Sequence, residues 1–163
     1  MIRIRPATLS DAPILCDIQQ QAFLPLYERY RDKHNPCFRG EEDITRRLCT
    51  PSFRYFTILD DETIVGGIFY KCAGSIPHHG KLQSGEYYLQ RVYILPSRQG
   101  QRIAQTAIRL CEETFTDAVA FFVDFPFDLA KNRRCYEAAG YKDTGETMHV
   151  ENNLTLSIYE KHL

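Results

Sequence analysis

Apolar and polar side chains follow one another along this chain in patterns that distinguish strands from helices. Residues 2–5, "IRIR", alternate apolar and basic side chains up to Pro6, which predicts a half-buried strand. Ser10 or Asp11 can cap a helix whose apolar positions then recur at near-helical spacing until Pro25 stops it. We therefore expect one strand and then one helix at the start of the chain.

Two further segments precede the first group of strands. Residues 26–40 mix aromatic and charged side chains without a clear period, which predicts a loop with room for a short helix. Residues 41–50, "EEDITRRLCT", place acidic side chains before arginines, an order that complements the helix dipole. A short helix that ends before Pro51 is therefore expected.

Three β-rich runs come next. Residues 54–74 and 85–96 are rich in β-branched and aromatic side chains. The acidic residues 60–62 divide the first of these segments as a hairpin turn, and a looser loop at 75–84 precedes the last run. Three consecutive strands in an antiparallel meander are the expected result.

The second half of the chain predicts a helix, a strand and another helix. Residues 101–116 carry apolar side chains on one side of a helical wheel and polar ones on the other. Residues 118–125, "AVAFFVDF", are almost wholly apolar, as is typical of a central strand covered on both faces. Asp128 can cap the next helix, which runs through Ala139 and ends at Gly140.

Two strand-like runs, around 141–149 and 153–160, complete the pattern. The resulting order, β-α-α-β-β-β-α-β-α-β-β, predicts a layered α/β (α+β) fold in which helices cover a mixed sheet. A chain of 163 residues is long enough for one such domain and too short for two ordinary ones. We therefore expect residues 1–163 to form a single domain.

The amino-acid composition limits the kinds of partner and the location that are expected for this protein. The chain is 44% hydrophobic and 25% charged with a formal net charge of −1, which gives no bulk attraction to nucleic acid or to an acidic membrane. No apolar run approaches the ~20 residues that span a bilayer, and the first residues lack the features of a signal peptide. We expect a cytoplasmic protein whose six cysteines, none in a CxxC pair, are reduced thiols without a metal.

Residues 95–108, "LPSRQGQRIAQTAI", carry the first chemical signal. They lead from a strand through a short loop with one glycine, Gly100, into a helix. Backbone N–H groups and the positive end of the helix dipole converge at such a point and stabilise an anion. The same residues are also compatible with a simple turn, because every strand that precedes a helix needs one.

Two motifs resemble the GCN5-related N-acetyltransferase (GNAT) superfamily. "YYLQRVYILPSRQGQRIAQTAI" is similar to its acetyl-CoA-binding segment, Arg/Gln-x-x-Gly-x-Gly/Ala, with Arg102 in place of the usual middle glycine. "NRRCYEAAGYKDTG" is similar to its segment in which a helix bearing a tyrosine, here Tyr136, ends in Gly-Tyr. The family often has an asparagine where this chain has Leu129, and Asn132 lies one helical turn closer. The motif positions of the first segment are Gln99, Gly100, Gln101, Arg102, Ile103 and Ala104.

The resemblance implies a mostly antiparallel sheet of about seven strands with helices on both faces. It also implies that acetyl-CoA lies where two central strands separate, with its pantetheine amides paired to exposed backbone. The pantetheine partners would be Val92, Tyr93 and Ile94. Residues 100–105, from Gly100 to Gln105, would surround the pyrophosphate. The side chains of Arg98 and Arg102 could add charge-assisted hydrogen bonds to it.

The implied chemistry is the attack of a neutral amine on a thioester. Tyr136 is the expected general acid for the departing thiolate, and Asn132 could orient it or hold the cofactor. The general base is Glu86 or Asp124, both near places where family members carry a carboxylate. A Pro-His-His-Gly loop that contains His78 is interpreted as solvated.

The acceptor would lie against the first helices and the late hairpin, as in the family. Phe23, Tyr27 and Tyr30, with His34 and Phe38, could wall an amine pocket or form an aromatic lid on the core.

The expected function is direct acetyl transfer to a primary amine in a ternary complex. Polyamine, antibiotic, amino acid and protein N-terminus remain open as acceptors. The alternative is a non-catalytic acyl-CoA-binding or sensing module, and an exposed late strand could pair two copies as a homodimer.

Overall fold

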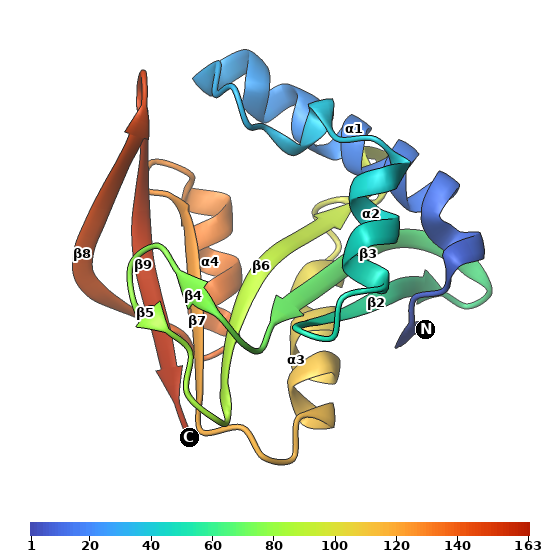
Figure 1. Cartoon of the computed structure of the whole chain (residues 1–163). Coiled ribbons are helices and arrows are strands. Elements are labelled where there is room, and N and C mark those ends of the chain that lie inside the picture. The colour runs from blue at the N-terminus through green and yellow to red at the C-terminus, as the bar shows by residue number, and fades with distance from the viewer.

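A sheet of seven strands forms the centre of the fold in the computed structural model, which describes residues 1–163 (Figure 1). Neighbouring strands are antiparallel except for β6 and β7, which are parallel. The predicted mixed, mostly antiparallel sheet and its three-strand meander are therefore confirmed. In spatial order the strands are β1 (Ile2–Pro6), β2 (Phe53–Asp60), β3 (Thr63–Lys71), β6 (Glu86–Ile94), β7 (Ala120–Pro126), β9 (Leu154–His162) and β8 (Lys142–Glu151).

Helices cover both faces of this sheet. The first face is covered by α1 (Ala12–Tyr30) and α2 (Glu41–Leu48), and the second by α3 (Ile103–Thr114) and α4 (Ala130–Ala138). Short 3₁₀ turns form η1 (Leu9–Asp11), η2 (Pro36–Phe38) and η3 (Pro96–Arg98), and the loop at 75–84 contains a small ribbon of β4 (Ser75–Ile76) and β5 (Gly80–Lys81). None of the helices combines the length and the apolar character needed to cross a membrane.

Apolar side chains of opposite sheet faces build two separate cores. Ile108 of α3 packs in a cluster with Phe121 of β7, while Leu15 of α1 and Ile44 of α2 pack in a cluster with Phe69 of β3. All five side chains are at most 1% exposed. Burial of side chains of this size is worth about 1.5–3 kcal/mol each, so both layers hold the sheet in place.

Two predicted helix boundaries are wrong. Helix α1 does not stop at Pro25 but continues to Tyr30, although a proline inside a helix removes one backbone hydrogen bond. Its last turn is held from outside: the Tyr30 hydroxyl donates to Asp128 at 2.5 Å, and Arg29 donates to the same carboxylate at 3.0 Å. Because Asp128 is engaged in this way, it does not cap α4, which has Leu129 at its N-cap position.

A buried carboxylate joins the start of α1 to the sheet. Asp11 accepts hydrogen bonds from the Arg5 guanidinium at 2.6 and 3.0 Å, from the Thr8 amide at 2.9 Å and from the Thr57 hydroxyl at 3.0 Å. These bonds, that of Arg5 first, hold the pKa of Asp11 well below its usual range. The ionised carboxylate is therefore stabilised by the folded state.

We predict that Asp11→Asn lowers the free energy of unfolding by about 2 kcal/mol at pH 7, because it removes hydrogen bonds to a charged group. The folded pKa is lowered, so this contribution is complete above the unfolded pKa of about 3.9 and is lost as the pH falls below it. Urea unfolding at pH 7, 5 and 3 should show the difference from wild type shrinking only at pH 3.

Asp17→Asn is the matched control, since Asp17 is exposed and bonds only to Gln21 of the same helix. It should change stability by less than about 0.5 kcal/mol. Equal losses for both variants, or a loss at Asp11 that does not depend on pH, would contradict the prediction.

Candidate active site

The strands β6 and β7 separate halfway along their length. Their parallel ladder ends at the pair of Leu89 with Val123, after which β7 continues beside β9 and β6 beside β3. Gln90 is an extra residue in β6, because Phe69 pairs with Arg91 while the next residue of β3 pairs with Leu89. A bulge of this kind increases local twist. A cleft of about 1020 Å³, here called the β6–β7 cleft, opens where the strands part.

The loop between β6 and α3 brings a row of backbone N–H groups to this cleft. None of the N–H groups of residues 100–105, here called the amide row, donates to an acceptor within the chain. Gly100 has φ +79°, and α3 begins at Ile103. Free amides at a helix N-terminus, together with the helix dipole, stabilise an anion.

Arg102 stands where the family motif has its middle glycine. Its backbone has φ +61° and ψ +21°, the left-handed conformation that glycine adopts without strain. Its side chain is exposed and makes no hydrogen bond within the chain. The arginine therefore follows the backbone path of a glycine, at a conformational cost of about 1–2 kcal/mol.

The remaining predicted cofactor residues lie around the same cleft, apart from Gln101, which is exposed outside it. Val92 and Ile94 belong to the sheet face covered by α3, and Tyr93 to the face covered by α1. Arg98 lines the cleft but is ion-paired with the carboxylate of Asp60. The others that line the cleft are Gln99, Gly100, Arg102, Ile103, Ala104, Gln105 and Asn132.

Gln99 links the end of β6 to α4. Its side-chain amide donates to the Ile94 carbonyl oxygen at 3.0 Å and accepts from Lys131 at 3.0 Å. These bonds fix the residue directly before Gly100. Lys131 and Arg134 of α4 also line the cleft and add positive charge to it, which the sequence interpretation did not anticipate.

Tyr136 reaches the cleft from α4. Its ring is 7% exposed and stacks on Phe125 with ring centroids 4.9 Å apart, and its hydroxyl makes no hydrogen bond within the chain. Burial raises the pKa of this phenol well above its ordinary value, so it stays protonated at neutral pH. Asn132, one turn earlier, lines the same cleft and makes no hydrogen bond to Tyr136.

The two predicted base candidates differ in position. Asp124 lines the cleft, where its Oδ2 accepts from the Tyr88 hydroxyl at 2.7 Å and lies 3.0 Å from His78 Nε2, while its Oδ1 has no partner. Glu86 lies at the opposite end of β6, outside the cleft. There it accepts from the Gln83 amide at 2.8 Å, which is the main cause of its lowered pKa.

The Pro-His-His-Gly loop was interpreted from the sequence as solvated, and this interpretation is wrong for His78. The His78 side chain is 4% exposed and packs edge-on against Tyr88. Ile76 and Leu82 of the same loop are buried among Tyr88 and Phe122. The loop therefore belongs to the packed face beside Asp124, and the buried apolar positions on both sides of His78 were the signal in the sequence.

The far end of the cleft is formed by the end of α1, the following loop and the β8–β9 hairpin. Phe23, Tyr30 and His34 line it, whereas Tyr27 lies outside and packs edge-on against Phe38 with centroids 4.6 Å apart. Figure 1 shows the hairpin turn beside the C-terminal end of α1. In the turn, Asn152 donates to the carbonyl of Arg31, the C-cap of α1, at 3.0 Å, and Asn153 donates to the carbonyl of Arg29 in α1 at 3.3 Å, which holds these two elements together.

Arg91 is a charged cleft residue that the sequence interpretation missed. Its side chain is 9% exposed, and its Nη1 donates to Gln19 Oε1 at 3.0 Å and to Asp43 Oδ2 at 3.4 Å. Burial, and then the nearby charge of Arg47, lower the pKa of Arg91 from its usual value. The available signal was one cation in the interior of the strand "EYYLQRVYI", whose other charged residue, Glu86, lies at its first position.

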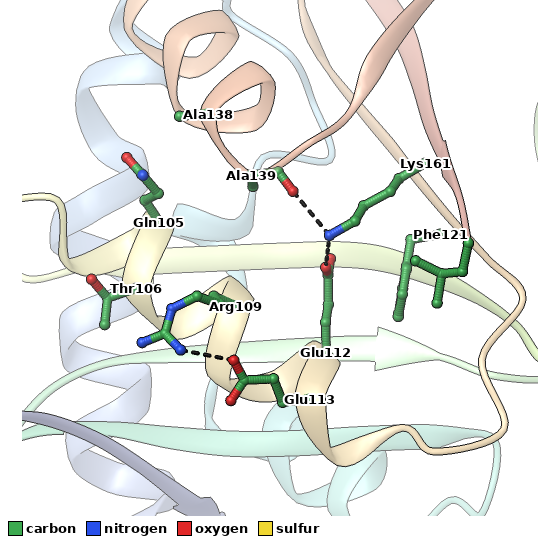
Figure 2. A pocket seen from close by; sticks show the side chains of 10 residues that line it. Gln105, Thr106, Arg109, Glu112, Glu113, Phe121, Ala138, Ala139 and Lys161 are labelled. Carbon is green, nitrogen blue, oxygen red and sulfur yellow. Dashed lines mark hydrogen bonds and ion pairs between the residues drawn. The ribbon is translucent and has the colours of Figure 1, made fainter.

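A second hollow, of about 450 Å³, lies between α3, α4 and the end of β9 (Figure 2). Its charged groups satisfy one another. Arg109 pairs with Glu113 at 2.8 Å, and Lys161 donates to Glu112 at 2.8 Å and to the Ala139 carbonyl at 3.0 Å. With these charges already paired, the hollow shows no group prepared for a ligand.

Solved structures share this fold at low sequence identity. A PaiA N-acetyltransferase from Thermoplasma acidophilum with coenzyme A has a TM-score of 0.77 at 14% identity, covering 100% of this chain and 99% of that one. The aminoglycoside acetyltransferase AAC(6')-Ib with paromomycin and acetyl-CoA has 0.75 at 14%, covering 99% and 93%. A ribosomal-protein-S5-alanine acetyltransferase from Vibrio fischeri has 0.75 at 16%, covering 99% and 92%.

No curated protein sequence matches the chain significantly. A family model described as "Acetyltransferase (GNAT) family" matches residues 15–141, which include the cleft strands, the amide row and Tyr136. This match confirms the resemblance of the two motifs. Because it spans well over half of the sequence, the chain belongs to the GNAT acetyltransferase family.

Proposed function

We propose that this protein is an N-acetyltransferase that moves the acetyl group of acetyl-CoA to a primary amine by direct attack in a ternary complex. One observation carries the proposal: five of the six residues of the amide row line the same cleft as Tyr136, and neither their N–H groups nor the Tyr136 hydroxyl has a partner within the chain. An anion cradle and a protonated acid are the two parts that binding acetyl-CoA and releasing its thiolate require.

The cofactor would bind along the unpaired edge of β6. Its pyrophosphate would accept hydrogen bonds from the amide row, with Arg102, Lys131 and Arg134 adding positive charge around it. The pantetheine amides would pair with the backbone of residues 92–94, where the ladder to β7 has ended. This position directs the thioester towards the point where β6 and β7 part.

Tyr136 would act as the general acid. When the amine nitrogen forms its bond to the acetyl carbon, the bond from that carbon to sulfur breaks and the electron pair stays on sulfur. A phenol kept protonated by burial can give its proton to this thiolate. Asn132, which lines the cleft one turn away, would contact the cofactor rather than Tyr136.

Asp124 would receive the amine. An alkyl ammonium is mostly protonated at neutral pH and must lose a proton before it attacks. The free Oδ1 of Asp124 can accept a hydrogen bond from the ammonium, while the Tyr88 hydroxyl on Oδ2 keeps the carboxylate in place. We therefore favour Asp124 over Glu86, which lies outside the cleft.

The structural neighbours support an amine as the acceptor but do not indicate which amine this chain would use. One neighbour was solved with an aminoglycoside and acetyl-CoA, and another is called a ribosomal-protein-S5-alanine acetyltransferase. In this chain the acceptor end of the cleft has apolar walls that include Phe23, Val150 and Leu156. A small primary amine with an apolar portion would fit such walls.

The direct test is an acceptor screen. Purified protein is incubated with acetyl-CoA and pools of primary amines, and products are detected by a mass increase of one acetyl group together with CoA release. We expect at least one amine class to be acetylated. Tight acetyl-CoA binding without any transfer would instead support a non-catalytic acyl-CoA-binding module.

Replacing Gly100 should weaken cofactor binding. Gly100→Val places a β-branched side chain at φ +79°, which distorts the loop, and we expect the Kd for acetyl-CoA to rise about 10-fold or more. Gly145→Val is the matched control, because Gly145 has φ +82°, equally open space around it and no place in the cleft. Calorimetry on both variants should show a loss of affinity only at Gly100, and equal affinities would exclude the cradle.

Removing the Tyr136 hydroxyl should slow turnover. Tyr136→Phe keeps the stacking on Phe125 but removes the acid, so we expect kcat to fall about 100-fold or more with the acetyl-CoA Kd within about 2-fold. Tyr141→Phe removes a hydroxyl that bonds Glu112 outside the cleft and should leave kcat nearly unchanged. Unchanged turnover in Tyr136→Phe would rule out the acid role.

A further inference from the structure

Two buried arginines, one from α2 and one from β6, share one buried carboxylate of α2. Arg91 and Arg47 are each 9% exposed, and both direct a guanidinium nitrogen to Asp43, which is 7% exposed. Arg46 also pairs with Asp43 but is 60% exposed. A buried charge needs compensation, and a single carboxylate cannot neutralise two guanidinium groups. The cluster therefore carries an uncompensated positive charge.

Both buried arginines keep free donors, because only Nε of Arg47 and Nη1 of Arg91 bond within the chain, but only Arg91 lines the β6–β7 cleft. A guanidinium has five N–H donors, yet only Nη1 of Arg91 makes hydrogen bonds within the chain. Its Nε and Nη2 are not enclosed either, because the only fully enclosed side-chain polar atoms without a partner are those of Tyr70 and Gln90. Since Arg91 lines the β6–β7 cleft, its free donors open into that cleft.

Arg91 lies on the acceptor side of the sheet. It pairs in register with Phe69, which packs with α1 and α2, and its guanidinium lies 5.1 Å from the centre of the Phe69 ring. Tyr88 and Asp124 lie on this same face, on the other side of the bulge. The Arg91 guanidinium and the Asp124 carboxylate, whose Oδ1 is free, thus line the cleft from this face of the sheet. The amide row belongs to the α3 side.

We propose that Arg91 binds a carboxylate carried by the acceptor, so that the substrate is a free amino acid or another amine with its own carboxylate nearby. The inference rests on the proposed function and names its substrate class. Two free guanidinium donors match the two oxygens of a planar carboxylate. Asp124 Oδ1 remains for the ammonium group at the other end of the same molecule. A polycationic acceptor would be repelled by Arg91.

The test compares amino acids with related amines that have no carboxylate. Phenylalanine, leucine and methionine are each compared with their carboxamide and their decarboxylated amine. Binding is measured by calorimetry with CoA in the cofactor site, so that the result does not depend on turnover. We expect at least one amino acid to bind 10-fold or more tightly than its two partners, and transfer to show the same preference through KM rather than kcat.

Arg91→Gln should abolish this preference, and Arg91→Lys should retain part of it because the charge remains. Arg46→Gln removes an exposed arginine from the same carboxylate without touching the cleft and should leave the preference intact. If Arg91→Gln does not fold, the wild-type comparison decides alone. Equal binding of amino acids and their partners, or no binding of any, overturns the inference.

Failure of the proposed function gives a different result. If amino acids bind through Arg91 but no amine is acetylated, the carboxylate site stands and the transferase proposal fails. If carboxamides and simple amines are acetylated as well as amino acids, and Arg91→Gln changes nothing, the transferase proposal stands and the carboxylate site is excluded.

Discussion

The parting of β6 and β7 after the pair of Leu89 with Val123 is the constraint on which the site depends. Beyond this pair each strand keeps a partner on its outer side, β3 for β6 and β9 for β7, while the β6–β7 ladder is not resumed. The extra residue Gln90 adds twist at the point of separation. The sheet thereby leaves part of the β6 edge unpaired, a state that favours a ligand able to supply the missing backbone partners.

The cleft is closed at its far end by bonds between elements that are distant in the sequence. Tyr30 and Arg29 of α1 bond Asp128 at the start of α4, and Asn152 of the hairpin turn bonds the carbonyl oxygen of Arg31. These bonds link the three elements around the far end of the cleft to one another. The cradle end needs no such links, because the amide row is part of the continuous path from β6 into α3.

Sequence reasoning succeeded where local pattern determines structure. The amphipathic helix α3, the apolar strand β7 and the meander could be read from periodicity alone, and Gly100 lies in the loop between strand and helix where the pattern placed it. It failed where a distant partner decides the outcome, as at Pro25 and Asp128, whose roles depend on contacts with each other's elements. Arg91 is a third such case, because its partners Gln19 and Asp43 are far away in sequence.

The two ends of the cleft are therefore encoded differently. The proposed cofactor end is made of backbone N–H groups, so what must be kept is a conformation, and Arg102 keeps the left-handed backbone of the glycine it replaces. The proposed acceptor end is made of side chains, so a single substitution there would change the chemistry that is recognised. A family motif can identify the first end at low sequence identity, whereas the second end must be determined from the charges and free donors of each chain.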